Sequence, residues 1–235
     1  MSTWLVINPN TSANVTQALL QHLGAGQAPG TSPGILQPTW QGITAPFGAP
    51  YIADERSYCI AGHAVLQAWE QAQSDAPPAG YAGVLVGCFG DPGVHALREV
   101  TTVPVHGLAE ASLQALWAQG AQRVAIVTGG AAWQAMLQRW ARAQNLYRTP
   151  QQIGPGICHI AVLPTSAGEM MAAPEAAAQA LAHAGEQALA ESDADAVLLG
   201  GAGLAGMGER VRRSGALPVW DCVELVRQAL PPTRS

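Results

Sequence analysis

The stretch GVLVGCFGDPGVHALREVTTVPVHGLAEASLQAL (83–116) decides how this chain folds, because AVLLGGAGLAGMGERVRRSGALPVWDCVELVRQAL (196–230) repeats it. With one residue inserted before Pro218, the two stretches match at hydrophobic, glycine, proline and acidic positions: Val84/Val197, Leu85/Leu198, Gly87/Gly200, Gly90/Gly203, Gly93/Gly206, Pro104/Pro218, Val105/Val219 and Glu110/Glu224. More weakly, residues 4–23 match residues 123–140, with Asn8 opposite Thr128. The chain is therefore predicted to consist of two similar halves related by a pseudo-twofold axis.

Short apolar runs alternate with segments of helical periodicity along the whole chain, which predicts an α/β protein. The expected strands are WLVI (4–7), GVLVG (83–87), PVHGL (104–108), RVAIV (123–127), HIAVL (159–163), AVLLG (196–200) and LPVW (217–220). Together with the repeat, they predict two pseudo-twofold-related lobes, each a parallel sheet with helices on both faces. Residues 1–112 and about 215–235 are assigned to the first lobe, and residues 113–214 to the second.

The composition excludes several classes of enzyme and of binding partner. The chain has 235 residues, of which 49% are hydrophobic and 11% charged, so it is long and apolar enough to bury a core. A net charge of −5 argues against a nucleic acid or an anionic membrane as partner and favours a small-molecule substrate. All 11 basic residues are arginine. The absence of lysine excludes Schiff-base enzymes and nucleotide hydrolases with a phosphate loop.

The cysteines and histidines show no metal-binding spacing, so no metal is expected. The four cysteines, Cys59, Cys88, Cys158 and Cys222, lie far apart in the sequence. No apolar stretch approaches the roughly 18 residues of a membrane helix, and the N-terminus does not resemble a signal peptide. The sequence therefore predicts a cytoplasmic protein with reduced thiols.

The predicted strand ends are where a ligand is expected, because open parallel sheets bind ligands beyond the carboxyl ends of their strands. In the first lobe these ends are Asn8–Ser12 and Cys88–Asp91, and in the second lobe they are Thr128–Ala131 and Gly201–Gly203. Two such edges facing each other would form a cleft between the lobes with the active site in it. Backbone N–H groups in these turns can hold a carboxylate or an enolate oxygen.

Cys88 is the predicted catalytic residue. It closes the strand GVLVG and precedes FGDPG, in which Asp91 and Pro92 are expected to be the N-cap and first residue of a helix. A thiol near a helix N-terminus is more easily ionised and can act as a base or a nucleophile. Cys59 and Cys158 are expected to be structural, and so is Cys222, with less support from its position beside Asp221.

Several motifs occur in an order that resembles the Asp/Glu/hydantoin racemase superfamily, in particular its hydantoin and allantoin racemase branch. They are INPNTS, GAPYIADE, GCFGDPG, VPVHGLAEA, LGGAGLAG and PVWD, and the resemblance runs from Leu5 to about Leu230. It implies a cofactor-independent, homo-oligomeric isomerase in which two cysteines, one from each lobe, exchange the proton on a carbon next to a carbonyl. Cys88 matches the first cysteine of the family pattern. The second position is Gly201.

The replacement of the second cysteine by Gly201 leaves three functions open. The first is a racemase for hydantoins or amino-acid derivatives, with water, Thr128 or a substrate group as the second acid. The second is a single-cysteine lyase of the arylmalonate decarboxylase type, and the third is a small-molecule-binding member without turnover. In each case substrate binding is expected at Asn8, Phe89, Thr128, Gly129, Gly201 and Ala202.

Overall fold

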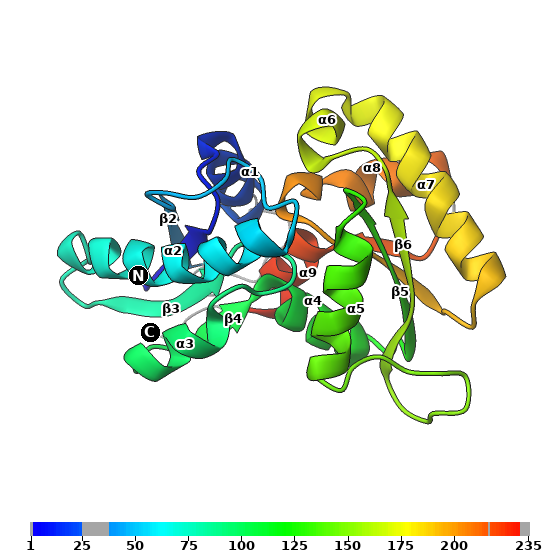
Figure 1. Ribbon diagram of the computed structural model, residues 1–235, viewed down its shortest axis with the longest axis horizontal. Helices are drawn as coiled ribbons and strands as arrows, with labels where there is room; N and C mark the ends of the chain where they lie inside the picture. Colours follow the sequence, from blue (N-terminus) through cyan, green and yellow to red (C-terminus); the bar gives the residue numbers. More distant parts are fainter. Residues whose placement is uncertain (1, 25–37, 216, 231–235) are drawn as a thin grey trace, which may run out of the picture. The chain divides into compact units, whose positions relative to one another are not determined.

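The computed structural model describes residues 2–24, 38–215 and 217–230. Residue contacts divide the chain into two compact units: unit 1 comprises Met1–Ala111 with Val226–Ser235, and unit 2 comprises Ser112–Leu225. Each unit holds a four-stranded parallel sheet with helices packed on it (Figure 1). The predicted α/β class with two lobes is confirmed.

Unit 1 has the strand order β2-β1-β3-β4, and its neighbouring strands pair in parallel. Its strands are β1 (Thr3–Asn8), β2 (Thr39–Thr44), β3 (Tyr81–Val86) and β4 (Val105–Gly107), and its helices are α1 (Ala13–Gly24), α2 (Glu55–Ser74) and α3 (Val94–Val100).

Unit 2 has the order β6-β5-β7-β8, which is the same arrangement of second, first, third and fourth strands. Its strands are β5 (Arg123–Gly129), β6 (Gly156–Leu163), β7 (Ala196–Leu199) and β8 (Val219–Asp221), and its helices are α5 (Trp133–Ala143), α6 (Ala167–Ala172), α7 (Pro174–Glu191), the short 3₁₀ helix η1 (Ala202–Leu204) and α8 (Met207–Ser214). Helices α4 (Leu108–Ala118) and α9 (Cys222–Ala229) each begin in one unit and end in the other. The identical strand order agrees with the predicted repeat.

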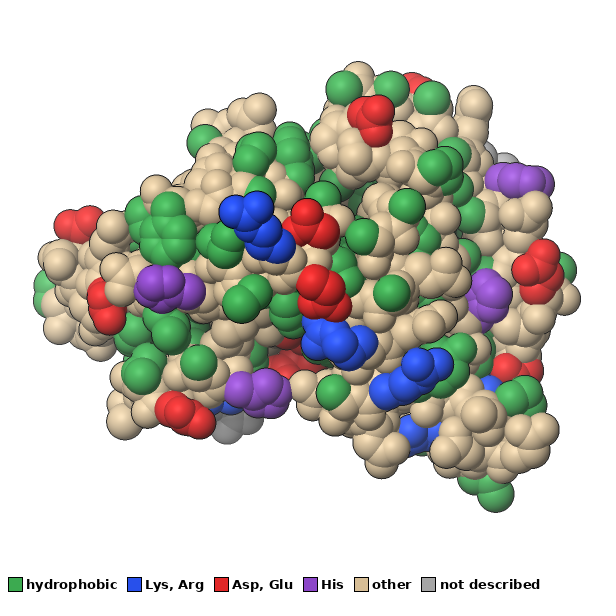
Figure 2. All heavy atoms as spheres, viewed as in Figure 1, with side chains coloured by type: hydrophobic (Ala, Val, Ile, Leu, Met, Phe, Trp, Pro, Cys, Tyr) green, Lys and Arg blue, Asp and Glu red, His purple; other side chains and the backbone are tan. Residues whose placement is uncertain are grey.

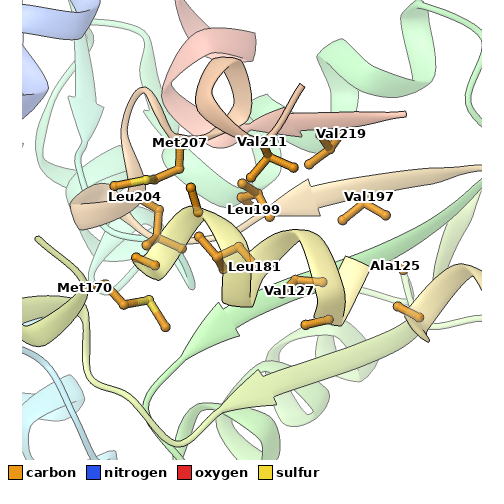
Figure 3. Close-up of a cluster of buried hydrophobic side chains, with 14 residues drawn as sticks. Ala125, Val127, Met170, Leu181, Val197, Leu199, Leu204, Met207, Val211 and Val219 are labelled. Atoms are coloured by element: carbon orange, nitrogen blue, oxygen red, sulfur yellow. The ribbon is translucent and has the colours of Figure 1, made fainter. Parts of the chain in front are cut away.

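The strands form where the sequence has apolar runs because both faces of each sheet are covered. In unit 2, alternate side chains of β5, β7 and β8 pack against α6, α7 and α8 (Figure 3). In unit 1, Leu5 and Ile7 of β1 pack with Val65 and Trp69 of α2. On the opposite face α1 packs so closely that a Cβ at Gly87 would lie 2.6 Å from a Leu19 methyl carbon. Strands buried on both faces lose the polar alternation of exposed strands.

Strand β2, with the sequence TWQGIT, was not predicted. It is an edge strand whose residues are mostly half-buried, so it lacks the continuous apolar run of the central strands. It pairs with β1 from Thr3↔Thr39 to Asn8↔Thr44. Tertiary pairing, which local sequence does not encode, therefore decides this element.

The chain returns to unit 1 at Val226 and not near residue 215 as predicted. The reason is strand pairing: Val219 lies opposite Val197 and Asp221 lies opposite Leu199, so β8 completes the sheet of unit 2.

Charged side chains are sparse and of mixed sign on the face shown in Figure 2, without a broad area of one charge. Within the three described stretches of chain, no helix is both long and apolar enough to cross a membrane.

The central side chain of the unit 2 core provides a test of this packing. Leu181 on α7 is fully buried against β5 and β7 (Figure 3). Leu181→Ala leaves a cavity there and is expected to lower the free energy of unfolding by about 2–5 kcal/mol. Urea unfolding followed by circular dichroism measures this. Gln179→Ala, at an exposed position of the same helix, is the control and should change stability by less than about 0.5 kcal/mol.

Candidate functional site

Cys88 lies in a turn immediately after the central strand β3. The Gly87 N–H donates to the Ile7 carbonyl at 2.8 Å, which completes the pairing of β3 with β1. The N–H of Asp91 then donates to the Cys88 carbonyl at 3.1 Å and closes the turn. The Cys88 side chain is largely buried, and Phe89 beside it is buried as well. We call residues 88–93 the Cys88 loop.

Helix α2 fixes the Cys88 loop from one side. The Tyr58 hydroxyl donates to the Gly90 carbonyl at 2.5 Å. Gly93 has a φ of 76°, and a Cβ there would lie 2.6 Å from the Gly62 carbonyl oxygen, so only glycine fits. Tyr58 was not among the predicted site residues. Its partner lies 32 residues away in the chain, and no local pattern indicates such a contact.

Asp91 fixes the Cys88 loop from the other side. Its carboxylate accepts hydrogen bonds from the N–H groups of Ala109 at 2.8 Å and Glu110 at 3.0 Å, in the first turn of α4. The prediction that Asp91 and Pro92 begin the next helix is therefore wrong: α3 begins at Val94, with Gly93 before it. Cys88 consequently lies in a turn and not at a helix N-terminus.

Asp91 is held in an environment that disfavours its charge. Burial and, to a lesser extent, the nearby Glu110 raise the pKa of its carboxyl group, to about 7 when all of its surroundings are taken together. The two N–H donors and Arg98 act in the opposite direction and favour the carboxylate. Asp91 also has a left-handed backbone, with a φ of 57°, which is uncommon outside glycine and costs conformational energy.

The loop after β1 is organised by Asn8. Its amide nitrogen lies within hydrogen-bond distance of Asn10 Oδ1, the Ser12 carbonyl and Thr16 Oγ1, at 2.9–3.0 Å. Its side-chain oxygen accepts from the N–H of Asn10 at 3.3 Å. Asn8 is fully buried, so these contacts shape the loop next to the Cys88 loop.

In unit 2, Thr128 and Gly129 end β5. The Thr128 hydroxyl donates to the Gly200 carbonyl at 2.5 Å, which links the ends of the neighbouring strands β5 and β7. A Cβ at Gly129 would lie 2.4 Å from the Thr165 carbonyl oxygen. A side chain at position 129 therefore does not fit.

Gly201 follows β7 and has a φ of 144° and a ψ of 130°. A Cβ there would make only ordinary contacts, at 3.6 Å from Leu204 Cγ and 3.8 Å from Thr128 Oγ1. The space for a cysteine exists, but the backbone conformation is one that L-residues rarely adopt. Ala202, in the first position of η1, is buried beside it.

Cys222 contacts the backbone of the loop that contains Gly201. Its thiol is fully buried and lies 3.6 Å from the Gly201 carbonyl oxygen, to which it can donate. Burial and the adjacent Asp221 raise the pKa of this thiol far above its ordinary range. Cys222 therefore stays protonated and supports the loop.

The predicted site residues thus gather at two sheet edges, one in each unit. Asn8 ends β1, and Cys88 and Phe89 follow the neighbouring strand β3. Thr128, Gly129, Gly201 and Ala202 lie at the ends of the neighbouring strands β5 and β7. In the described part of the chain, no cluster of three or more His, Cys, Asp or Glu residues could hold a metal ion.

Comparisons with known proteins agree with the fold and the motifs. The family model described as Asp/Glu/Hydantoin racemase matches residues 5–230. A hydantoin racemase of Paenarthrobacter aurescens is 28% identical over 222 residues, which cover 94% of this chain and 86% of the relative. The structure of allantoin racemase from Klebsiella pneumoniae has a TM-score of 0.79 at 24% identity, covering 97% of this chain and 85% of that one. Arylmalonate decarboxylase has a TM-score of 0.58 at 20% identity, covering 95% and 88%.

The buried Asp91 predicts a specific pH dependence of stability. Between its ordinary pKa of 3.8 and its folded pKa of about 7, the folded state holds a proton that the unfolded chain has lost. The free energy of unfolding should therefore fall as pH rises from about 4 to about 7, by up to about 4 kcal/mol from this group. Asp91→Asn should remove that slope.

Urea midpoints of the wild type and Asp91→Asn at intervals from pH 4 to pH 8 measure the effect. Glu99→Gln, which changes an exposed carboxyl on α3, is the matched control and should keep the wild-type slope. A wild-type slope that persists in Asp91→Asn would assign the effect to another group.

Proposed function

Because the chain belongs to the Asp/Glu/hydantoin racemase family, we propose that it is a racemase-like enzyme that moves the proton on a carbon next to a carbonyl group. Its substrate is a hydantoin or a related amino-acid derivative, and the thiol of Cys88 carries the proton. The observation that supports this best is the Cys88 loop. A thiol at the end of a central strand, in a loop fixed by Tyr58 and Asp91, has the defined position that proton transfer from carbon requires.

The reaction proceeds through an enolate. The Cys88 thiolate takes the proton, the electrons of the C–H bond move into the carbon–carbon bond, and the carbonyl oxygen becomes negative. Return of a proton to the carbon restores the carbonyl. Backbone N–H groups near that oxygen stabilise its charge, and we propose that of Phe89 for this role. Those of Gly129 and Ala202 are proposed anion-binding groups at the strand ends of unit 2.

The other proposed ligand residues act mainly on their loops. Asn8 and Thr128 both use their side chains for bonds within their own unit, so they fix the loops that present the backbone amides. This refines the expectation that they contact the substrate through their side chains.

Racemisation also requires a proton donor for the opposite face of the carbon, and Gly201 supplies no thiol. The Thr128 hydroxyl oxygen lies 3.8 Å from the position that a Cβ at Gly201 would occupy. If the protein racemises its substrate, we propose that a water molecule or a substrate group is the second donor, or that the Thr128 hydroxyl leaves the Gly200 carbonyl to take this role.

A one-face reaction is the second candidate, and the missing thiol at Gly201 favours it. In a decarboxylation, loss of carbon dioxide generates the enolate without a base, and Cys88 alone protonates it. The shared fold of arylmalonate decarboxylase is compatible with this chemistry. A binding protein without turnover is the remaining alternative.

Exchange with deuterated water separates these functions. We expect the wild type to incorporate deuterium at carbon 5 of an enantiopure 5-substituted hydantoin, above a blank without protein. Cys88→Ala should lower this rate by at least about 10²-fold, because the proton carrier is lost. Cys59→Ala, which removes an exposed thiol, is the matched control and should keep the wild-type rate.

Optical rotation recorded in the same experiment identifies the reaction. Loss of rotation together with deuterium uptake indicates a racemase, whereas uptake with retained rotation indicates one-face exchange and directs the next assay to malonate-type acids. If the wild type does not exceed the blank, hydantoins are not its substrates.

Restoring the second thiol provides a further test. Gly201→Cys has room for its side chain but should lose about 1–3 kcal/mol of stability because of its φ of 144°. If a second acid is what limits inversion, this variant should racemise at least about 10²-fold faster than the wild type. Gly201→Ala has the same strain without the thiol, so equal racemisation rates in the two variants would contradict a two-base reaction.

A further inference from the structure

Each unit has an arginine–glutamate pair beside the helix that follows its fourth strand. We call this pair, together with the strand carbonyl that the arginine binds, the polar frame. In unit 1, Arg98 of α3 donates to the Val105 carbonyl at 2.8 Å and pairs with Glu110 of α4. In unit 2, Arg212 of α8 donates to the Val219 carbonyl at 2.6 Å and pairs with Glu224 of α9 at 2.8 Å. This frame shows which residues correspond in the two units.

A carboxylate lies beside this frame in both units, but it comes from different strands. In unit 2 it belongs to Asp221, at the end of β8. It accepts from the N–H of Glu224 at 2.9 Å and, through its other oxygen, from those of Gly206 at 3.1 Å and Gly208 at 3.3 Å. In unit 1 the corresponding amide of Glu110 donates to Asp91, which belongs to the Cys88 loop after β3.

The residue that corresponds to Asp221 in unit 1 is Gly107. A Cβ at Gly107 would lie 2.2 Å from Asp91 Cγ and 2.5 Å from its nearer oxygen. The space that the acidic side chain of β8 uses in unit 2 is therefore filled in unit 1 by Asp91. Conversely, Leu204 stands in place of Asp91 in unit 2 and is buried in the apolar core. The carboxylate therefore follows the third strand in unit 1 and ends the fourth strand in unit 2.

We propose that Asp91 is a positioning residue that ties the Cys88 loop to the first turn of α4 and thereby fixes the Cys88 thiol. This inference rests on the proposed role of Cys88. Because Asp91 is only three residues from Cys88, its two bonds to α4 restrain the loop directly. In unit 2 the equivalent bonds come from β8, so the loop of Gly201 is held through Gly206 and Gly208, beyond η1.

The arrangement of unit 2 can be built into unit 1 by two substitutions. Asp91→Gly removes the carboxylate, and glycine accepts the φ of 57° at this position. Adding Gly107→Asp supplies a carboxylate from β4, as unit 2 does from β8. Gly107→Asp alone is expected to be unstable because its side chain overlaps Asp91.

Hydrogen exchange at the Ala109 and Glu110 amides, followed at one pH, tests the tie without any substrate. We expect at least 10-fold faster exchange in Asp91→Gly and at least partial recovery in the double variant. If Asp91→Gly does not fold, Asp91→Asn, which keeps one acceptor oxygen, should show the same change to a smaller extent. Unchanged exchange in these variants would overturn the proposal.

Position of the thiol is tested by two independent readouts. Deuterium incorporation into the hydantoin should fall at least 10-fold in Asp91→Gly and recover at least 3-fold in the double variant. Alkylation of Cys88 by iodoacetamide, measured on its own peptide by mass spectrometry, should become at least 3-fold faster in Asp91→Gly, because release of the loop exposes a residue that is only 8% exposed in the wild type.

The two readouts separate this proposal from the proposed function. If the wild type exchanges no hydantoin proton, the substrate assignment fails, while the alkylation rates still decide the role of Asp91. Faster amide exchange without any change in alkylation or deuterium incorporation would make Asp91 merely structural and overturn the proposal. The Glu99→Gln variant should match the wild type in every measurement.

Discussion

Backbone N–H groups at the carboxyl edges of the two parallel sheets need acceptors, and the loops of this protein are built to provide them. Each loop turns directly from a buried strand, so its amides cannot all be satisfied by neighbouring strands. Asp91 and Asp221 accept from the first turns of α4 and α9. Asn8 binds within the loop after β1, and Thr128 joins the ends of β5 and β7. These bonds determine where Cys88 and Gly201 lie within their own units.

The internal repeat preserves this framework more faithfully than the chemical groups on it. The Arg98–Glu110 and Arg212–Glu224 pairs occupy equivalent positions, and the order of the four strands is the same in both units. At the loop positions, by contrast, Cys88 corresponds to Gly201. A framework of this kind lets the two loops differ in chemistry while the sheets that carry them stay alike.

Gly201 differs from a cysteine in its backbone conformation as well as in lacking a thiol. Its φ of 144° belongs to a backbone conformation that glycine adopts at little cost. The buried Cys222 thiol can donate a hydrogen bond to the Gly201 carbonyl. The loop after β7 therefore has its own conformation. In the proposed mechanism, acid–base chemistry depends on the single thiol of Cys88, so the fixed geometry of the Cys88 loop is its central feature.

The sequence by itself determined the α/β class, the repeat and the central strands, because buried apolar runs and glycine turns leave local patterns. Its ordered motifs also indicated the family. It also led to the prediction that Cys88 is catalytic, from its place after a strand. Only the tertiary structure decided edge strand β2, the membership of β8 in unit 2, the contact of Tyr58 with Gly90 and the role of Asp91 as a cap for α4. Each of these depends on partners distant in the chain, and a local sequence pattern carries no information about such partners.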